Sequence, residues 1–270
     1  MKRFLNGTQI DIPIAHIRVN DYDAIAAAFD RCMGDDYADI IAAPMLGAAK
    51  GLLRQSRIRH LDIGCGTGVL LLKLARRFGT DAHGVDLSAG QIRQAKIRAG
   101  KLGVQASFTV GDMRTTDFQE DFDLVTCNFD ALNHVREPSA WIRIFRKVRR
   151  SLTDNGMFFF DLNTPNRIIR DWSNPEVILK HNICYLHCGL ELRRGSGFVR
   201  RKLLMQVFDL SDRFYRRSTA IVEETAIPNR TVITMLRRAG FSHVRLVPIA
   251  PALRASHVFM RNRAFFCATP

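Results

Sequence analysis

The chain lacks the features of several protein classes. No apolar run reaches the ~18 residues needed to cross a membrane, and Met1-Lys2-Arg3 is followed by polar Asn6 and Gln9 instead of the apolar core of a signal peptide. We find no internal repeat and no low-complexity segment. The six cysteines are scattered over 270 residues, which favours reduced thiols over a disulfide framework. These absences predict a soluble, cytoplasmic protein that does not enter the membrane.

Acidic residues are scarce. The chain has 26 Asp and Glu against 40 Lys and Arg, for a formal net charge of +14. Such a charge attracts nucleic acid, anionic surfaces or an acidic small molecule. The basic residues are nevertheless dispersed and form no long block, as on the solvated surface of a protein from an arginine-rich proteome. Both interpretations stay open.

Strand and helix patterns alternate over most of the chain. Apolar runs predict seven strands, at residues 58–63, 82–85, 108–110, 122–127, 157–162, 243–247 and 264–268. Helical periodicity and capping residues predict the helices between them, at residues 68–77, 88–100, 138–152 and 229–240. Ser88 and Gln91 form a capping box. This alternation predicts an α/β fold, in which helices flank a parallel sheet.

Two regions depart from this alternation. Residues 1–55 form a helical N-terminal flank, with two helices expected between residues 21 and 55 and with Asp21 and Asp35 or Asp36 as their caps. Residues 172–227 show period-two runs, typical of antiparallel strands. The expected strands are 177–186, 198–210 and 214–224. We therefore expect one domain built from residues 1–171 and 228–270, into which residues 172–227 are inserted as a β lid.

A glycine turn follows the first predicted strand, in the sequence Asp62-Ile63-Gly64-Cys65-Gly66-Thr67-Gly68. Its glycines permit close approach of a ligand and positive φ angles, and the next helix offers free N–H groups. A dinucleotide site would have the spacing G-x-G-x-x-G, whereas here the spacing is G-x-G-x-G. Asp62 would repel a pyrophosphate but attract an ammonium or sulfonium group.

Two further carboxylates follow the next strands. Asp86 ends the second strand, 22 residues after Gly64, where an acidic side chain can accept hydrogen bonds from both ribose hydroxyls. Asp112, in Gly111-Asp112-Met113 after the third strand, could accept one from an adenine amino group. Each alone could be an ordinary cap or turn residue. Together they lie at the carboxyl ends of successive strands, where such sheets bind ligands.

These segments resemble the successive motifs of class I S-adenosylmethionine-dependent methyltransferases. The matching stretches are residues 62–68, Val85-Asp86-Leu87-Ser88, Gly111-Asp112-Met113-Arg114, residues 122–127 with Leu132-Asn133-His134-Val135, and Asn155-Gly156-Met157-Phe158 with Asp161. The resemblance implies a Rossmann-like seven-stranded methyltransferase sheet and S-adenosyl-L-methionine as the cofactor. The cofactor contacts that it implies are Asp62, Gly64, Cys65, Gly66, Gly68, Asp86, Leu87, Asp112, Met113 and Asn128.

Within this superfamily the chain looks most like small-molecule methyltransferases, including the sugar-amine N-methyltransferases of antibiotic pathways. It shares an aromatic-Asp pair and an Asp-Tyr pair before the first strand, here Phe29-Asp30 and Asp36-Tyr37. The family often has a tyrosine at the position of Phe29, and Tyr22 or Tyr37 could supply the missing hydroxyl to the cofactor. This resemblance implies an N- or O-methyltransferase for a small molecule of natural-product biosynthesis.

The same resemblance places the loop after strand 122–127 beside the methyl group. His134 is the candidate general base because an imidazole titrates near neutral pH, although it could instead pack against adenosine or cap a helix. Asp130 could orient an amine. Asn133 and His134, with Tyr185 and Arg200 from the lid, are the candidate acceptor-binding residues.

The lid also contains the spacing His181-x-x-Cys184-x-x-His187-Cys188. In a strand the two histidines face one side and the two cysteines face the other. Four such side chains cannot converge on one metal ion without a break in the strand. We therefore predict no metal site.

Other functions remain alternatives at this stage. The net charge allows an RNA methyltransferase, although the chain has no recognisable RNA-binding module. A non-catalytic partner subunit would bind the cofactor without transferring a methyl group, and a dehydrogenase would bind a nicotinamide nucleotide. The sequence does not identify the acceptor, and it leaves a homodimer open.

Overall fold

A computed structural model describes residues 4–5, 8–9, 22–23, 25–55, 57–118, 121–180, 182–209, 216–256 and 260–270 of the chain. A seven-stranded sheet forms its centre, with the strand order β12-β13-β7-β6-β3-β4-β5. The strands are β3 (Arg59–Ile63), β4 (Asp81–Asp86), β5 (Ala106–Val110), β6 (Phe122–Cys127), β7 (Leu152–Asn163), β12 (His243–Val247) and β13 (Arg263–Thr269). The pairings from β5 to β7 are parallel, and β13 is antiparallel to both of its neighbours. The predicted seven-stranded α/β sheet is confirmed, with one reversed strand.

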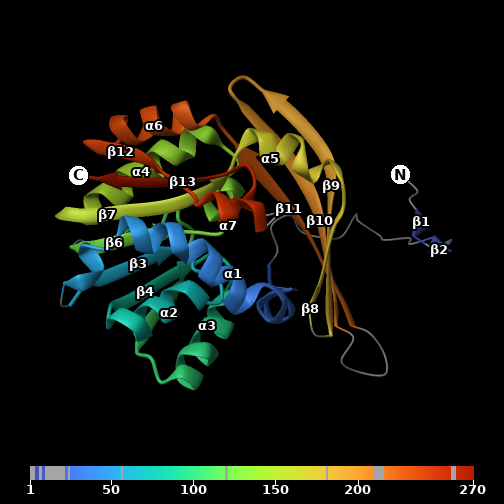
Figure 1. Cartoon of the computed structure of the whole chain (residues 1–270), viewed down its shortest axis with the longest axis horizontal. Coiled ribbons are helices and arrows are strands. Elements are labelled where there is room, and N and C mark those ends of the chain that lie inside the picture. Colours follow the sequence, from blue (N-terminus) through green and yellow to red (C-terminus); the bar gives the residue numbers. More distant parts are fainter. Residues whose placement is uncertain are drawn as a thin grey trace.

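Helices cover both faces of this sheet (Figure 1). One layer contains α1 (Ala26–Ala48), α2 (Val69–Phe78) and α3 (Ala89–Leu102), and the other contains α4 (Pro138–Ser151) and α6 (Asn229–Arg238). The predicted Ser88 cap of α3 is confirmed, because its side chain accepts a hydrogen bond from the Gln91 N–H at 3.0 Å.

The central strand β7 is buried on both faces. Phe158 and Phe160 lie in the cluster formed with Phe145 of α4, while Phe159 lies in the cluster formed with Ile41 of α1. Successive strand residues point to opposite faces, so a continuous apolar run can fill both layers. The alternation of phenylalanines between two clusters has this origin.

The N-terminal flank differs from its prediction. One helix, α1, spans Ala26–Ala48 in place of the two expected helices, and a 3₁₀ turn, η2 (Leu52–Arg54), follows it. Asp35 and Asp36 lie within α1 and do not start a second helix. Ile41 and Met45 of α1 are fully buried, and this packing favours a continuous helix over the local capping signal. Asp21 lies outside the described residues.

The segment between β7 and α6 forms a separate four-stranded antiparallel sheet, in the order β11-β10-β9-β8. Two short helices, α5 (Pro165–Ile169) and η4 (Asp171–Ser173), precede it. Its strands are β8 (Glu176–Lys180), β9 (Ile183–Gly195), β10 (Phe198–Asp209) and β11 (Arg216–Ala226). This sheet stands at one end of the central sheet (Figure 1). We call it the lid sheet.

The prediction of a single strand at residues 177–186 was wrong. Val177 pairs with Leu186 and Lys180 pairs with Ile183, so β8 and β9 form a tight hairpin. Period-two alternation continues through such a hairpin and hides the reversal. Small elements outside the two main sheets are β1 (Phe4–Leu5), β2 (Thr8–Gln9), η3 (Ala131–His134) and α7 (Pro251–Ser256).

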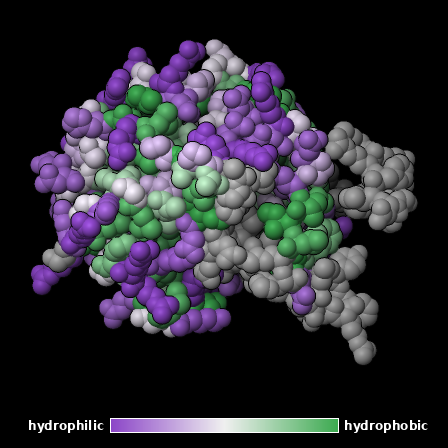
Figure 2. All heavy atoms as spheres, viewed as in Figure 1, coloured by the Kyte–Doolittle hydropathy of each residue, from purple (hydrophilic) through white to green (hydrophobic). Residues whose placement is uncertain are grey.

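Hydrophilic residues cover much of the face in Figure 2, with a hydrophobic patch over the lid sheet. On α4 the basic residues Arg143, Arg146 and Arg150 are exposed, as expected for a solvated face. No helix in the described part of the chain is long and apolar enough to span a membrane. The five cysteines with described side chains are all free.

Candidate active site

The glycine turn has left-handed backbone geometry at three positions. Gly64, Gly66 and Gly68 have φ angles of +71°, +55° and +71°, a region that other residues rarely adopt. The Gly64 N–H donates a hydrogen bond to the Val85 carbonyl at 2.7 Å, which holds the turn against β4. A Cβ atom on Gly64 would lie 2.6 Å from the Ala131 Cβ. The turn therefore lies in direct contact with the loop after β6.

Asp86 connects the turn to the end of β4. Its carboxylate accepts hydrogen bonds from the N–H groups of Gly66, at 2.8 Å, and Ser88, at 2.9 Å. Burial raises the pKa of Asp86, and these two N–H groups oppose the rise. Its side chain also lines the main cavity of the protein.

Asp62 lies behind the turn. It is buried, and its carboxylate accepts a hydrogen bond from the Thr126 hydroxyl at 2.6 Å. The His60 Nε2 lies 2.8 Å from the same hydroxyl oxygen, so it must donate there, because Thr126 gives its only proton to Asp62. Burial raises the pKa of Asp62 to about 7 and lowers that of His60 to about 3.

One cavity of about 440 Å³ lies between the glycine turn and the lid sheet. The central sheet contributes the turn, Asp86, the loop after β6 and Arg263. The lid sheet and the helices before it contribute Arg167, Trp172, Glu176, Val177, Ile178, Tyr185, His187, Met205 and Glu224. The two halves are continuous, so a ligand on the turn and one under the lid sheet can touch.

A tyrosine–histidine pair lies in this cavity. The Tyr22 hydroxyl is 3.0 Å from the His134 Nε2, and the two rings meet edge to face. Burial lowers the pKa of His134, because a charged imidazolium is poorly solvated there. His134 is therefore neutral near pH 7 and able to accept a proton.

A carboxyl cluster lies on the other side of His134. Asp130 has a φ angle of +53°, and its carboxylate is 2.6 Å from the Arg263 guanidinium. Arg263 also pairs with Asp161, which accepts hydrogen bonds from the N–H groups of Phe129, at 2.7 Å, and Asp130. Burial raises the pKa of Asp161 to about 6 although Arg263 opposes the rise. Arg263 and Asp161 thus hold the loop after β6 in place.

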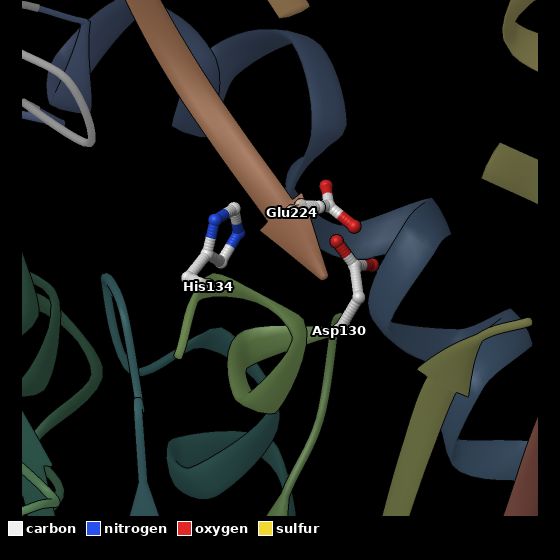
Figure 3. Close-up of side chains that lie close together, drawn as sticks. All are labelled: Asp130, His134 and Glu224. Carbon is white, nitrogen blue, oxygen red and sulfur yellow. The ribbon is translucent and has the colours of Figure 1, made fainter. Parts of the chain in front are cut away.

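Glu224 of β11 completes the cluster. Its carboxyl group accepts a hydrogen bond from the Asn163 side chain at 2.9 Å. Polar atoms of Asp130, His134 and Glu224 all lie within 4.8 Å of one another (Figure 3). Such a spacing could accommodate a metal ion, a possibility that the sequence did not indicate at these positions.

Residues 61–156 match the methyltransferase domain family. The ubiquinone biosynthesis O-methyltransferase of Idiomarina loihiensis is 30% identical over 151 residues, which are 55% of this chain and 58% of that protein. The chain thus spans little more than half the length of its curated relatives. Residues 61–156 of the chain are thus similar to a methyltransferase domain.

Solved structures agree on this fold. A methyltransferase of Clostridium acetobutylicum, named as S-adenosylmethionine-dependent, superposes with a TM-score of 0.72 at 18% identity over 92% of this chain and 98% of its own. A sugar N-methyltransferase of Streptoalloteichus sp. superposes with a TM-score of 0.64 at 19% identity over 99% and 98% of the two chains. Both superpositions cover nearly the whole chain, and they therefore include the lid sheet.

The predicted cofactor contacts divide into two groups. Those that line the cavity are Tyr22, Gly64, Cys65, Gly66, Asp86 and Asn128. Asp62 lies behind the turn, Leu87 is 61% exposed, and Asp112 forms an ion pair with Arg114 at 2.6 Å. Met113 packs against Gly64, Gly68 ends the turn at the N-terminus of α2, and the Tyr37 side chain lies outside the described residues.

The predicted acceptor residues also divide. Asp130, His134 and Tyr185 line the cavity. The Asn133 amide donates hydrogen bonds to the carbonyls of Asn163 and Thr225, at 3.0 and 2.9 Å, and so joins the central sheet to the lid sheet. Arg200 donates to the Arg136 carbonyl and the Thr225 hydroxyl. Asn133 and Arg200 thus have structural partners and do not line the cavity.

Sequence patterns identified only some of the lid-sheet residues that line the cavity. Period-two alternation places Tyr185 and His187 on one face of β9, and both are buried and line the cavity. His181 lies outside the described residues. Arg167, Glu176, Glu224 and Arg263 were missed, although Glu223 and Glu224 directly follow the apolar run Ala220-Ile221-Val222, where carboxylates are unusual.

Proposed function

We propose that the protein binds S-adenosylmethionine on the glycine turn and transfers its methyl group to a nitrogen or oxygen atom of a small molecule held under the lid sheet. One observation carries the proposal: a single cavity is lined on one side by the turn and on the other by the lid sheet. The likeness to a sugar N-methyltransferase supports a small acceptor, and the likeness to an amino pentose methyltransferase of Micromonospora echinaspora involved in calicheamicin biosynthesis supports a role in natural-product biosynthesis.

The cavity fits the cofactor. Gly64 and Gly66 leave room for close backbone approach, and Asp86 offers acceptor oxygens for ribose hydroxyls. Asn128 is 2% exposed and lines the cavity, and neither polar atom of its side chain has a hydrogen-bond partner among the described residues. A buried amide of this kind calls for a polar ligand. Once bound, the sulfonium supplies an electrophilic methyl group.

The residues of the chain position the acceptor, exclude water from it and provide a base for its proton. Methyl transfer is an in-line displacement, so holding the acceptor against the methyl group lowers much of the barrier. Trp172, Val177, Ile178 and Met205 make the acceptor side of the cavity apolar and exclude water. His134 takes part in removing the proton of the acceptor, and Tyr22 orients the His134 ring through the 3.0 Å contact.

The cavity argues against the rival functions. A lid sheet over the acceptor side favours a small molecule over an RNA strand, and a steeply salt-dependent RNA affinity would reverse this preference. The acidic and basic residues that line the cavity in the described part of the chain are four acids, Asp86, Asp130, Glu176 and Glu224, and two bases, Arg167 and Arg263. This lining disfavours an acidic acceptor, although the whole chain is basic. A non-catalytic subunit would bind S-adenosylhomocysteine but methylate no acceptor.

Asp86→Asn is expected to weaken S-adenosylhomocysteine binding by about tenfold to a hundredfold, because a charged acceptor of hydrogen bonds is lost. Isothermal titration calorimetry measures this change. Asp81→Asn, at the exposed opposite end of β4, is the matched control and should bind normally. If the wild-type protein binds no S-adenosylhomocysteine, the proposed function is wrong.

His134→Ala is expected to lower turnover by about a hundredfold while the S-adenosylhomocysteine affinity stays within about twofold of wild type. Turnover is followed by transfer of a labelled methyl group to a panel of amino sugars and phenols. The exposed His243→Ala is the control. Unchanged turnover in His134→Ala would remove this residue from the mechanism.

A further inference from the structure

Two carboxyl groups from distant parts of the chain meet at the acceptor side of the cavity. Asp130 comes from the loop after β6 and Glu224 from β11 of the lid sheet (Figure 3). Their side chains are hydrogen-bonded to each other, and both line the cavity. Only folding of the lid sheet onto the central sheet brings them together.

This pair holds one proton and one negative charge. Two buried carboxylates in contact do not both ionise, and burial together with the Asp130 charge raises the pKa of Glu224 well above its usual range. The facing groups are Arg263, which is shared with Asp161, the side chains of His134 and Tyr22, which burial keeps neutral, and the Tyr185 side chain, which lines the same cavity. Asp130 and Asp161 share Arg263 as the one cation that pairs with them among the described residues, so the carboxyl groups of this cluster outnumber its guanidinium group.

Unused acceptor atoms surround the pair. Asn163 lines the cavity, and its buried Oδ1 has no hydrogen-bond partner among the described residues. The Asn128 side chain, which also lines the cavity, offers its Oδ1 as a further acceptor without a partner among the described residues, beside its Nδ2 donor. A charged site with such oxygen atoms matches a ligand that is positive and carries several N–H groups. A hydroxyl group has one proton and no charge, and so it would leave most of these atoms unpaired.

We propose that the Asp130–Glu224 pair binds the acceptor as an ammonium ion and takes up the proton that its nitrogen must lose, so that the methylated atom is an amine nitrogen. This inference rests on the proposed function and specifies its substrate class. The N–H bond breaks and its proton passes to the pair. The nitrogen lone pair then forms a bond to the methyl carbon, and the carbon–sulfur bond breaks with its electrons left on sulfur.

The products account for all the atoms and charges of this step. They are an N-methylated ammonium ion, S-adenosylhomocysteine and a proton on the carboxyl pair, which is later released to water. The positive sulfonium favours the proton loss, because it lowers the pKa of a nearby ammonium. Polar atoms of His134 and of both carboxyl groups lie within 4.8 Å of one another, so His134 can pass the proton on.

A divalent metal ion is the competing occupant of these groups. Their ligand atoms are already engaged, since Tyr22 contacts the His134 Nε2, Asn163 donates to Glu224 and Arg263 lies 2.6 Å from Asp130. A dication would also lie close to the Arg263 guanidinium, which repels it. An ammonium ion needs only the remaining oxygen lone pairs.

The test compares two ring molecules that differ only in the polar atom, cyclohexylamine and cyclohexanol. Their affinities for the full chain saturated with S-adenosylhomocysteine are measured by calorimetry. We expect wild type to bind the amine at least about tenfold more tightly. Glu224→Gln and Asp130→Asn should each lose this preference while S-adenosylhomocysteine affinity is unchanged. Glu191→Gln, an exposed carboxylate of β9, should keep it.

The pH dependence of wild type tests the proposal without any variant. The amine preference should fall on the acidic side, as the pair becomes fully protonated, and on the alkaline side, as the amine loses its proton. The proposal is overturned if the amine binds no better than the alcohol, if neither binds, or if binding requires added Mg²⁺ or Zn²⁺. Intact S-adenosylhomocysteine binding in those cases would leave the proposed function standing.

Discussion

Arg263→Met is expected to lower the free energy of unfolding by about 3–5 kcal/mol near pH 7.5, because it removes the cation from two buried carboxylates. The Arg263 side chain is almost fully buried between Asp130 and Asp161. Methionine fills a similar volume but offers no charge. Urea unfolding measures the change, and the exposed Arg261→Met, two residues away, should cost less than about 0.5 kcal/mol.

The same variant should be less destabilised near pH 5. The pKa of Asp161 is about 6 in the folded protein, above its value in an unfolded chain. Removal of Arg263 raises it further. Between the pKa of Asp161 in the unfolded chain and its higher pKa in the folded variant, the folded state binds more protons than the unfolded state. The free energy of unfolding of the variant therefore falls as the pH rises through this range. Equal losses near pH 5 and pH 7.5 would show that Arg263 acts by packing and not by charge.

Gly64→Ala is expected to weaken S-adenosylhomocysteine binding by at least about tenfold, because the new methyl group collides with the loop that faces the cofactor. The added Cβ would lie 2.6 Å from the Ala131 Cβ and 3.3 Å from the Met113 Cε. The turn, the loop after β6, or both must move. Calorimetric titration measures the loss.

The variant Gly79→Ala distinguishes the effect of this collision on ligand affinity from the effect of backbone strain on stability. Gly79 has a φ angle of +67°, close to the +71° of Gly64, but a Cβ atom there meets nothing within 4 Å. Both variants should lose about 1–2 kcal/mol of stability from the left-handed conformation. Only Gly64→Ala should lose affinity for the ligand. A similar loss of affinity in Gly79→Ala would attribute the effect to general destabilisation.

The charge of the chain and the charge of its cavity differ in sign. The net charge of +14 arises from dispersed side chains, whereas the acceptor side of the cavity contains more carboxylates than guanidinium groups. Composition alone therefore left open an acidic partner or a merely solvated basic surface, and the cavity favours a cationic ligand. A whole-chain sum is dominated by the surface and does not report on a small buried site.

The sequence by itself determined the sheet and the turn of this protein. Local signals sufficed there: apolar strands, the Ser88 cap and the glycines of residues 62–68, which share one short segment and need positive φ angles. Asp86 could likewise be predicted to lie beside the turn, where it lines the cavity, because it ends the strand next to the turn.

Tertiary structure alone decided the acceptor side. Glu224, Arg263 and Asp130 lie far apart along the chain and meet only when β11 and β13 come together beside the loop after β6. No local pattern encodes this meeting, since a strand residue reports its face and not its distant neighbour. Asn133 and Arg200 illustrate the same limit, because their polar groups suggested a ligand but are satisfied by backbone carbonyls of other segments.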